Sequence, residues 1–281
     1  MPPQKRIAFV DYKLDNFHAN TYLKAIRVNL KDRGYTITGC HALDESEGKT
    51  WATKNNVPYF STPQDLSDHA DSFCILAPSN PETHLNLARL VVPFGKPTYI
   101  DKTFAPDLKT AHEIFDLADQ HHTPVQTSSA LRYTDVQEHV KQGKENLLHL
   151  TAWGGGSSFA EYAIHPVEMA ISCLGPKATS LLRRTTGDFS QLLINFTSDR
   201  TATLNVYTHG NTPFAASLTT PNKTDYVPVN TSTLFTNMAS AILDFFDKGQ
   251  PQIDRAESLM IRHILDVAQD PRALKEFLPL T

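Results

Sequence analysis

The feature that most constrains this chain is a regular alternation in its first half. Over residues 6–130, short apolar runs alternate with longer amphipathic segments. The strand-like runs and the helix-like segments between them cover, in order, residues 6–10, 16–30, 35–42, 44–55, 72–77, 81–92, 97–102, 107–121 and 124–128. Strands that alternate with helices of this length are typical of βαβ units around a parallel sheet, joined by right-handed crossovers. The pattern predicts a doubly wound, Rossmann-like α/β domain.

After residue 130 the pattern changes to strand-like runs in series. They cover residues 147–153, 180–186, 191–197, 201–208 and 215–220, with a helix-like segment at 159–174 and two more at 232–248 and 254–268. Strands that follow one another without helices favour an antiparallel sheet. We expect an α+β second domain with an open, largely antiparallel sheet. The expected domains are residues 1–130 and 131–281, in keeping with ~150 residues per domain.

Composition narrows the class of protein. The 281 residues include 26 basic and 30 acidic side chains, a formal charge of −4, which argues against a nucleic-acid-coating protein. No apolar run approaches ~18 residues, and the N-terminus lacks a signal-peptide pattern, so we expect no membrane span and a cytoplasmic location. Cys40, Cys74 and Cys173 lie far apart in apolar stretches and are expected to be buried free thiols, with no metal site.

The first strand–turn–helix junction differs from the usual dinucleotide-binding one. There GxGxxG lets the backbone approach the pyrophosphate, but the first glycine of this chain is Gly34. The turn carries Asp11 and Asp15 instead, two carboxylates near the place of a pyrophosphate, with Lys13 as a compensating charge. Asp44, after the second strand, is a late candidate for the ribose hydroxyls and equally a helix cap. The residues of this turn give only weak support for dinucleotide binding in the usual mode.

Two other places carry candidate chemistry. Lys102 follows the fourth strand, where the carboxyl ends of parallel strands face a ligand crevice; a surface lysine paired with Asp101 is the alternative. In the second domain, Glu161 and His165 are four residues apart, so on one helix they share a face. A carboxylate beside an imidazole suits general acid–base chemistry, and a structural histidine is the alternative. Pro166 fits if a new helix starts there.

These residues carry a family resemblance. Leu76 to His84, then Gly95-Lys96-Pro97 and Asp101-Lys102-Thr103, resemble the N-terminal domain of the glucose–fructose oxidoreductase / inositol dehydrogenase (Gfo/Idh/MocA) family. The family usually has Glu-Lys-Pro at the last of these sites. The stretch from Gly155 to Gly175 is similar to its glycine-rich entry and acid-x-x-x-His stretch, with glutamate in place of aspartate.

The resemblance implies an oxidoreductase that moves a hydride between a nicotinamide cofactor, NAD or NADP, and a hydroxyl or keto group of a sugar, polyol or related molecule. The catalytic roles that it implies fall on Lys102, Glu161 and His165. The residues expected to line a cofactor cleft are Asp11, Lys13, Asn16, Pro78, Ser79 and Asn80. His84, Arg132 and Tyr133 lie near strand or helix ends on the crevice side and are substrate-binding candidates, with surface or packing residues as the alternative. The resemblance also implies a homo-oligomer through the sheet of the second domain.

Two alternatives stay open at this point. The aspartates in place of glycines favour a non-catalytic sugar-binding or regulatory protein that keeps the fold but has lost the cofactor site. Elimination or hydrolysis with the same three catalytic candidates is the other alternative. Binding of NAD(H) or NADP(H) would distinguish the dehydrogenase from the non-catalytic sugar-binding or regulatory protein.

Overall fold

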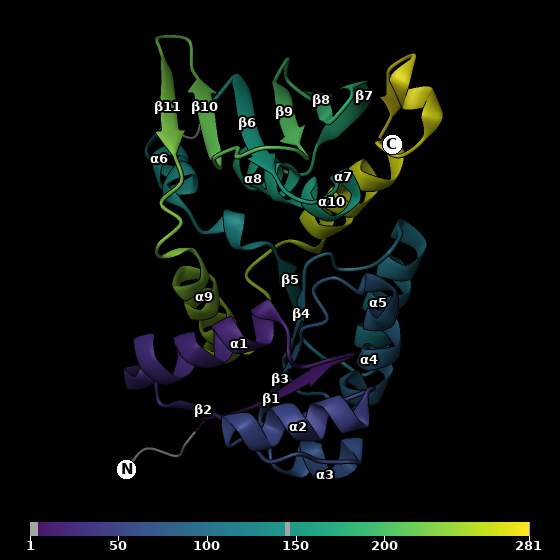
Figure 1. Cartoon of the computed structure of the whole chain (residues 1–281). Coiled ribbons are helices and arrows are strands. Elements are labelled where there is room, and N and C mark those ends of the chain that lie inside the picture. Colours follow the sequence, from purple (N-terminus) through teal and green to yellow (C-terminus); the bar gives the residue numbers. More distant parts are fainter. Residues whose placement is uncertain (1–4, 144–146, 281) are drawn as a thin grey trace. The chain divides into compact units, whose positions relative to one another are not determined.

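The computed structural model describes residues 5–143 and 147–280 and divides the chain into two compact units (Figure 1). The first unit comprises Met1–Ser128 with Phe235–Asp254, and the second comprises Ser129–Leu234 with Arg255–Thr281. The chain therefore passes from the second unit back into the first for one segment. The expected second domain, 131–281, includes that segment. The assignment of cofactor and substrate to separate domains stays a prediction.

The first unit is built on five parallel strands in the order β2-β1-β3-β4-β5. The strands are β1 (Lys5–Asp11), β2 (Tyr35–Ala42), β3 (Ser72–Ile75), β4 (Thr98–Asp101) and β5 (Val125–Ser128). Its helices are α1 (Phe17–Lys24), α2 (Glu45–Asn55), α3 (Pro63–Asp68), α4 (His84–Val91), α5 (Leu108–Gln120) and α9 (Leu234–Lys248), with a π-helical turn η1 (Ala25–Asn29) and 3-10 turns η2 (Lys31–Arg33), η3 (Pro81–Thr83) and η4 (Val92–Phe94). The predicted Rossmann-like sheet is confirmed.

The local signals in the sequence explain where these elements start and stop. The Asn16 side chain accepts a hydrogen bond from the Ala19 N–H and caps α1. Gly95 ends η4 with a positive φ of 70°, a conformation that favours glycine. Every residue of β3 and of β4 is buried, which is typical of strands covered by helices on both faces.

The second unit contains a seven-stranded sheet in the order β11-β10-β6-β9-β8-β7-β12. Its strands are β6 (His149–Gly155), β7 (Ala178–Thr186), β8 (Phe189–Phe196), β9 (Thr201–Tyr207), β10 (Ala215–Thr219), β11 (Thr224–Pro228) and β12 (Leu278–Pro279). Its helices are α6 (Asp135–Gly143), α7 (Phe159–Tyr162), α8 (Ile164–Leu174) and α10 (Arg255–Val267), with 3-10 turns η5 (Ala130–Arg132) and η7 (Pro271–Leu274).

Pairing in this sheet is antiparallel except between β6 and β9, so the sheet is mixed but mostly antiparallel, as predicted. Alternate residues of β8 are buried, which is the period-two pattern of a strand with one face on a core. Helix α8 covers that sheet in Figure 1 and is almost wholly buried. The homo-oligomer expected through this sheet stays a prediction.

Helix α9 belongs with the first sheet because charged and aromatic side chains hold it there. Arg33 binds Asp244 and Asp247 at 2.8 and 2.7 Å, and the Tyr35 hydroxyl donates to Asp247 at 2.8 Å. Phe235, just inside α9, packs edge-on against His18 with ring centres 5.4 Å apart. The sequence predicts this helix but contains no local signal for the unit that it joins.

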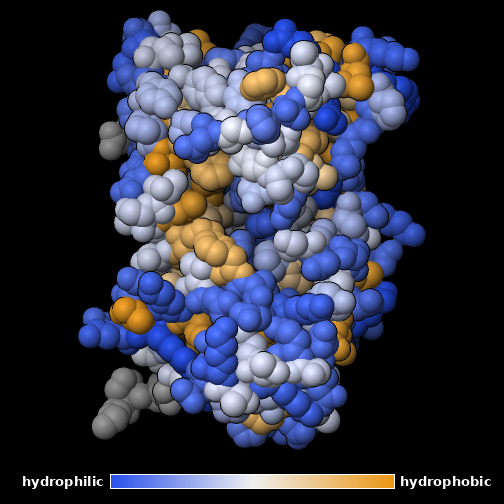
Figure 2. Space-filling view, viewed as in Figure 1, coloured by the Kyte–Doolittle hydropathy of each residue, from blue (hydrophilic) through white to orange (hydrophobic). Residues whose placement is uncertain are grey.

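The hydrophilic surface and the buried thiols are typical of a globular protein. The face in Figure 2 is mainly hydrophilic, with smaller hydrophobic areas. Cys40, Cys74 and Cys173 are free and buried, as predicted. Over residues 5–143 and 147–280, no helix is long and apolar enough to cross a bilayer.

Candidate functional site

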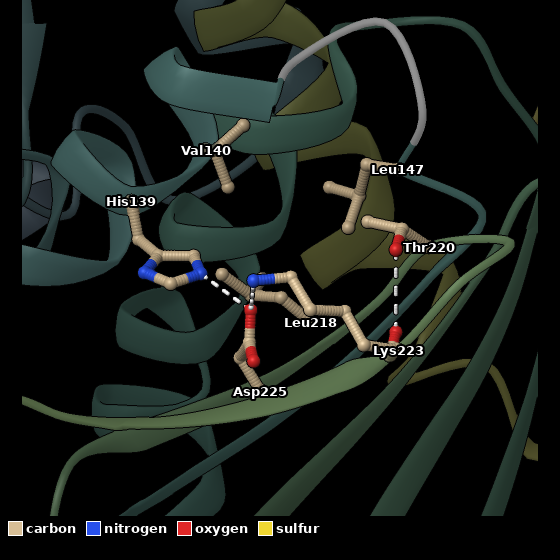
Figure 3. A pocket seen from close by; sticks show the side chains of 7 residues that line it. All are labelled: His139, Val140, Leu147, Leu218, Thr220, Lys223 and Asp225. Carbon is tan, nitrogen blue, oxygen red and sulfur yellow. Dashed lines mark hydrogen bonds and ion pairs between the residues drawn. The ribbon is translucent and has the colours of Figure 1, made fainter.

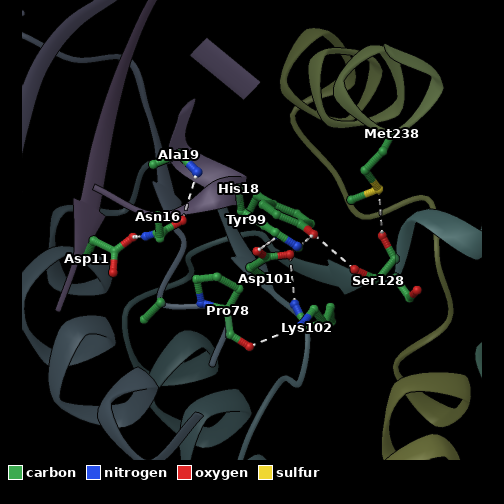
Figure 4. Close-up of polar contacts among 12 residues, drawn as sticks. Asp11, Asn16, His18, Ala19, Pro78, Tyr99, Asp101, Lys102, Ser128 and Met238 are labelled. Atoms are coloured by element: carbon green, nitrogen blue, oxygen red, sulfur yellow. Dashed lines mark hydrogen bonds and ion pairs between the residues drawn. The ribbon is translucent and has the colours of Figure 1, made fainter. Parts of the chain in front are cut away.

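Lys102 lies immediately after β4, at the carboxyl end of the parallel sheet. Only 7% of the residue is exposed, and the ammonium Nζ donates to the Pro78 carbonyl at 3.1 Å (Figure 4). A lysine ammonium has three N–H donors and is unfavourable to bury without acceptors. Pro78 is the one acceptor of Nζ among the described residues. The expected alternative, a surface lysine, does not hold for a side chain this buried.

Asp101 is the fully buried counter-charge beside Lys102. Its Oδ2 lies 2.5 Å from His18 Nδ1, and its Oδ1 accepts from the Tyr99 hydroxyl at 3.1 Å and from the Lys102 N–H at 2.9 Å (Figure 4). Burial raises the pKa of Asp101, but the charge and hydrogen bond of His18 and the charge of Lys102 together hold that pKa below its ordinary value. The carboxylate is therefore ionised and anchors the first turn of α1 to the end of β4.

The β1–α1 turn carries a second buried carboxyl group, Asp11. Its Oδ1 accepts from the Lys13 N–H at 3.1 Å, and its Oδ2 accepts from Asn16 Nδ2 at 2.8 Å. Burial raises the pKa of Asp11 to about 7 and outweighs these hydrogen bonds. Asp11 and Asn16, both predicted to bind cofactor, are thus brought together. The Lys13 ammonium lies 3.7 Å from Asp44, which caps α2 by accepting from the Glu47 N–H.

Glu47, from α2, completes this turn, and sequence reasoning missed it. Its two carboxylate oxygens accept hydrogen bonds from the backbone N–H groups of Leu14, at 2.8 Å, and Asp15, at 2.5 Å. These are donors of the strand–turn–helix junction at which a Rossmann-like fold ordinarily holds a pyrophosphate. In this conformation a carboxylate of the protein accepts from these two donors.

The loop after β3 holds three of the predicted cofactor-binding residues. Pro78 is buried, Asn80 is half-buried and Ser79 is exposed. His84, at the start of α4, is completely buried below this loop. Its Nε2 lies 3.1 Å from the Ala77 carbonyl and its Nδ1 lies 3.0 Å from the Phe104 carbonyl. Both ring nitrogens thus face the backbone, and burial lowers the pKa of His84. These contacts link the loops after β3 and β4 and are those of a structural histidine.

In the second unit, Glu161 and His165 lie on two short helices instead of one. The predicted helix 159–174 is interrupted at Ala163, and Pro166 then falls in the first turn of α8, where proline is tolerated. The Ser157 hydroxyl donates to Glu161 Oε2 at 3.0 Å. His165 Nδ1 lies 2.8 Å from the hydroxyl of Ser129, a buried residue that sequence reasoning missed. That contact fixes the orientation of the imidazole ring.

Arg132 lies in a buried ion cluster of the second unit. Its Nε donates to Glu168, and its Nη1 donates to Glu257 at 2.6 Å. Burial lowers the pKa of Arg132, but the two carboxylates outweigh it and raise that pKa above the ordinary value. The guanidinium is therefore engaged inside the unit. Tyr133, next along the chain, is half-buried.

The second unit also has a cavity of about 290 Å³, shown in Figure 3. It is lined by His139, Val140, Leu147, Leu218, Thr220, Lys223 and Asp225. Asp225 accepts from His139 Nε2 and lies against the Lys223 ammonium, each at 2.8 Å. None of the predicted site residues lines this cavity, so it is separate from the candidate catalytic groups.

Comparison with known proteins agrees with this architecture. A family profile described as "Oxidoreductase family, NAD-binding Rossmann fold" (GFO_IDH_MocA) matches residues 16–129. None of the curated proteins compared matches the chain.

Several solved structures share the fold over almost the whole chain. Myo-inositol 2-dehydrogenase from Lactobacillus plantarum has a TM-score of 0.82 and 12% identity, with 99% of this chain and 100% of that one covered. A probable dehydrogenase from Thermotoga maritima has a TM-score of 0.84 and 12% identity, with 98% of each chain covered. Myo-inositol dehydrogenase from Lactobacillus casei, in complex with NAD(H) and myo-inositol, has a TM-score of 0.83 and 11% identity, with 99% and 97% covered.

At this level of identity the solved structures show the fold, whereas the profile covers the Rossmann segment that carries Lys102 and begins at Asn16, after β1 and most of the β1–α1 turn. Together they support an NAD-binding oxidoreductase. Residues 16–129 of the chain match the profile of the Gfo/Idh/MocA oxidoreductase family.

Proposed function

We propose that this protein is a dehydrogenase that moves a hydride between a nicotinamide dinucleotide and a hydroxyl or keto group of a sugar or polyol. The family match supports the reaction class. The similarity to a myo-inositol dehydrogenase solved with NAD(H) and myo-inositol supports the substrate class. The observation that carries the proposal is the buried ammonium of Lys102 at the carboxyl end of the sheet.

Lys102 is proposed to bind the reacting oxygen. The Nζ donates one hydrogen bond, to Pro78, and a substrate hydroxyl is the kind of acceptor that its other N–H groups need. The buried Asp101 carboxylate balances the ammonium charge, so a neutral hydroxyl compound suits the site better than a second anion. Bound there, the hydroxyl oxygen would face a fixed positive charge, which stabilises negative charge as its proton leaves.

His165 and Glu161 are proposed to move that proton. Imidazole is the side chain whose ordinary pKa lies nearest to neutral pH, which suits proton transfer in either direction. The Ser129 hydroxyl at Nδ1 holds the ring in one orientation, which suits a fixed proton-transfer group. Glu161 would supply a favourable charge for a protonated ring. The dinucleotide, when bound, supplies the hydride chemistry, and the residues proposed to hold it are Asp11, Lys13, Asn16, Pro78, Ser79 and Asn80.

The test combines binding with turnover. Calorimetric titration with NADH and NADPH should show binding of at least one of them, and a panel of polyols that includes myo-inositol should show cofactor reduction. Lys102→Met should lower kcat at least a hundredfold while the affinity for the cofactor stays within twofold. Lys109→Met is the matched control, because the Lys109 side chain is 87% exposed. The absence of binding of either cofactor at millimolar concentration refutes the proposal.

A second candidate is a sugar-binding or regulatory protein without a dinucleotide. The observation that favours it is the Glu47 carboxylate on the β1–α1 turn. In that case a polyol should raise the melting temperature, whereas NAD(H) and NADP(H) should not.

A further inference from the structure

The backbone donors of the β1–α1 turn are used up by acceptors of the protein itself. The Lys13 N–H donates to Asp11 Oδ1 and the Asn16 N–H donates to the Leu14 carbonyl at 2.8 Å. The N–H groups of Leu14 and Asp15 both donate to Glu47. Every backbone N–H from residue 13 to residue 16 thus has an internal acceptor. A phosphate group that approached residues 13–16 would find each of their backbone N–H groups already bonded to the protein.

The position of Glu47 on α2 explains why its side chain reaches the turn. Asp44 is the N-cap of α2 and Glu47 is three residues later, which is the spacing of a capping box. In a capping box the glutamate accepts from the N-cap N–H, but the Asp44 N–H already donates to the Tyr12 carbonyl at 3.0 Å. The carboxylate of Glu47 is therefore available to bind elsewhere, and it binds across to the turn after β1.

The geometry of this contact is that of a bound anion. Two oxygens of one carboxylate accept from two consecutive N–H groups, 2.8 and 2.5 Å away, as two oxygens of a phosphate do. The missing glycines fit this arrangement, because Leu14 can keep a completely buried side chain where a pyrophosphate would otherwise need close backbone approach.

We propose that the Glu47 carboxylate is a built-in competitor for the pyrophosphate of a dinucleotide, so that binding at this turn requires Glu47 to move out. The identity of the competing dinucleotide rests on the proposed function, whereas the occupied anion site does not. Glu47 is half-buried on the first turn of α2, so its side chain can turn outward without unfolding the helix. As a consequence, the affinity of this turn for the cofactor is lower than it would be without the Glu47 carboxylate.

Removal of the carboxylate tests this directly. Glu47→Ala should bind inorganic pyrophosphate at least tenfold more tightly than the unmodified chain, which is about 1.4 kcal/mol, in calorimetric titrations at low salt. NADH should gain affinity in the same direction. Glu45→Ala is the matched control: it removes a carboxylate two residues away that binds Lys49 at 2.7 Å and makes no contact with the turn among the described residues. A gain of binding cannot come from loss of folding, and Glu47→Gln, which keeps the side-chain volume, serves if the alanine variant does not fold.

The outcomes separate the inference from the proposed function. Unchanged pyrophosphate affinity in Glu47→Ala overturns the inference, whether or not NADH binds. A gain for pyrophosphate without binding of NADH or NADPH to any variant supports the inference and refutes the dehydrogenase. An equal gain in the Glu45→Ala control assigns the effect to net charge and overturns the specific role of Glu47.

Discussion

Titration of Asp11 should make the first unit lose stability as the pH rises. Burial raises the pKa of Asp11 from an ordinary 3.8 to about 7 in the folded chain. The sign follows from linkage: a carboxyl group with a raised folded pKa contributes most stability below its unfolded pKa, and that contribution is lost as the pH rises through the folded pKa. At 1.36 kcal/mol per pKa unit, the loss between pH 4 and pH 8 is roughly 4 kcal/mol.

The measurement is urea unfolding from pH 4.5 to 8, compared between the unmodified chain and Asp11→Asn. Trp51 is 1% exposed in α2 and reports on the first unit, so both proteins carry Trp153→Phe, which removes the other of the two tryptophans. Between pH 4.5 and 8, the free energy of unfolding of Asp11→Asn should rise by about 3 kcal/mol relative to that of the parent. This difference does not depend on how many hydrogen bonds the asparagine keeps.

Asp15→Asn is the matched control, because Asp15 is exposed in the same turn and a hydrogen bond from Asn20 lowers its pKa. Its titration is complete below this range, so its difference from the parent should be flat. A change of less than about 1 kcal/mol for Asp11→Asn between pH 4.5 and 8, under the same conversion, refutes the reasoning that burial dominates at Asp11.

Two further predictions concern buried charge. Arg132→Leu should destabilise the second unit by about 3–5 kcal/mol, because it leaves the buried Glu168 carboxylate without its cation; Arg184→Leu, at an exposed arginine, should change the unfolding free energy by less than about 1 kcal/mol in the same urea titration. Burial raises the pKa of Asp247, but the hydrogen bonds from Lys5 and its other partners outweigh burial and lower that pKa to about 2. The Asp247 carboxylate therefore stabilises the fold above pH 4, and this stabilisation is lost as the pH falls through 2. The difference between the parent and Asp247→Asn, measured from pH 2 to 6, should therefore grow with pH by at most roughly 2 kcal/mol, less after solvent screening.

The sequence predicts best those parts of the fold whose signals are local in the chain. The alternation over residues 35–42 predicts β2 to the residue, because one strand is a local pattern. The predicted helix 16–30 is α-helical only as far as Lys24, because Ala25–Asn29 form a π-helical turn. In that turn the Leu30 N–H donates to the carbonyl of Ala25, five residues earlier. Side-chain periodicity does not specify that change of hydrogen-bond register. Helix α3 was missed because it has six residues, although Thr62, Pro63 and Asp65 carry an N-terminal signature.

The candidate site was predictable only in part, for the same reason. Lys102 follows a strand in an α/β pattern, and that position alone indicates the ligand side of the sheet. The partners that give each group its chemistry lie far away in the chain: His18 is 83 residues from Asp101, and Glu47 is 33 residues from Leu14. No local pattern encodes such pairs. His84 is the converse case, because its position predicts a substrate contact whereas its two ring nitrogens lie against backbone carbonyls.

The return of residues 235–254 to the first unit has a consequence for how the protein is made. When the ribosome has released the last strand of the first sheet, at Ser128, the helix that packs beside α1 is still to be synthesised. At 5–20 residues per second, the sheet waits roughly 6–25 s for it. During that interval the aromatic side chains of α1 that later pack against Phe235, those of Phe17, His18 and Tyr22, stay accessible to chaperones and to other nascent chains. A fragment cut at residue 130 keeps that exposure permanently, whereas a fusion of residues 5–128 to 235–254 removes it.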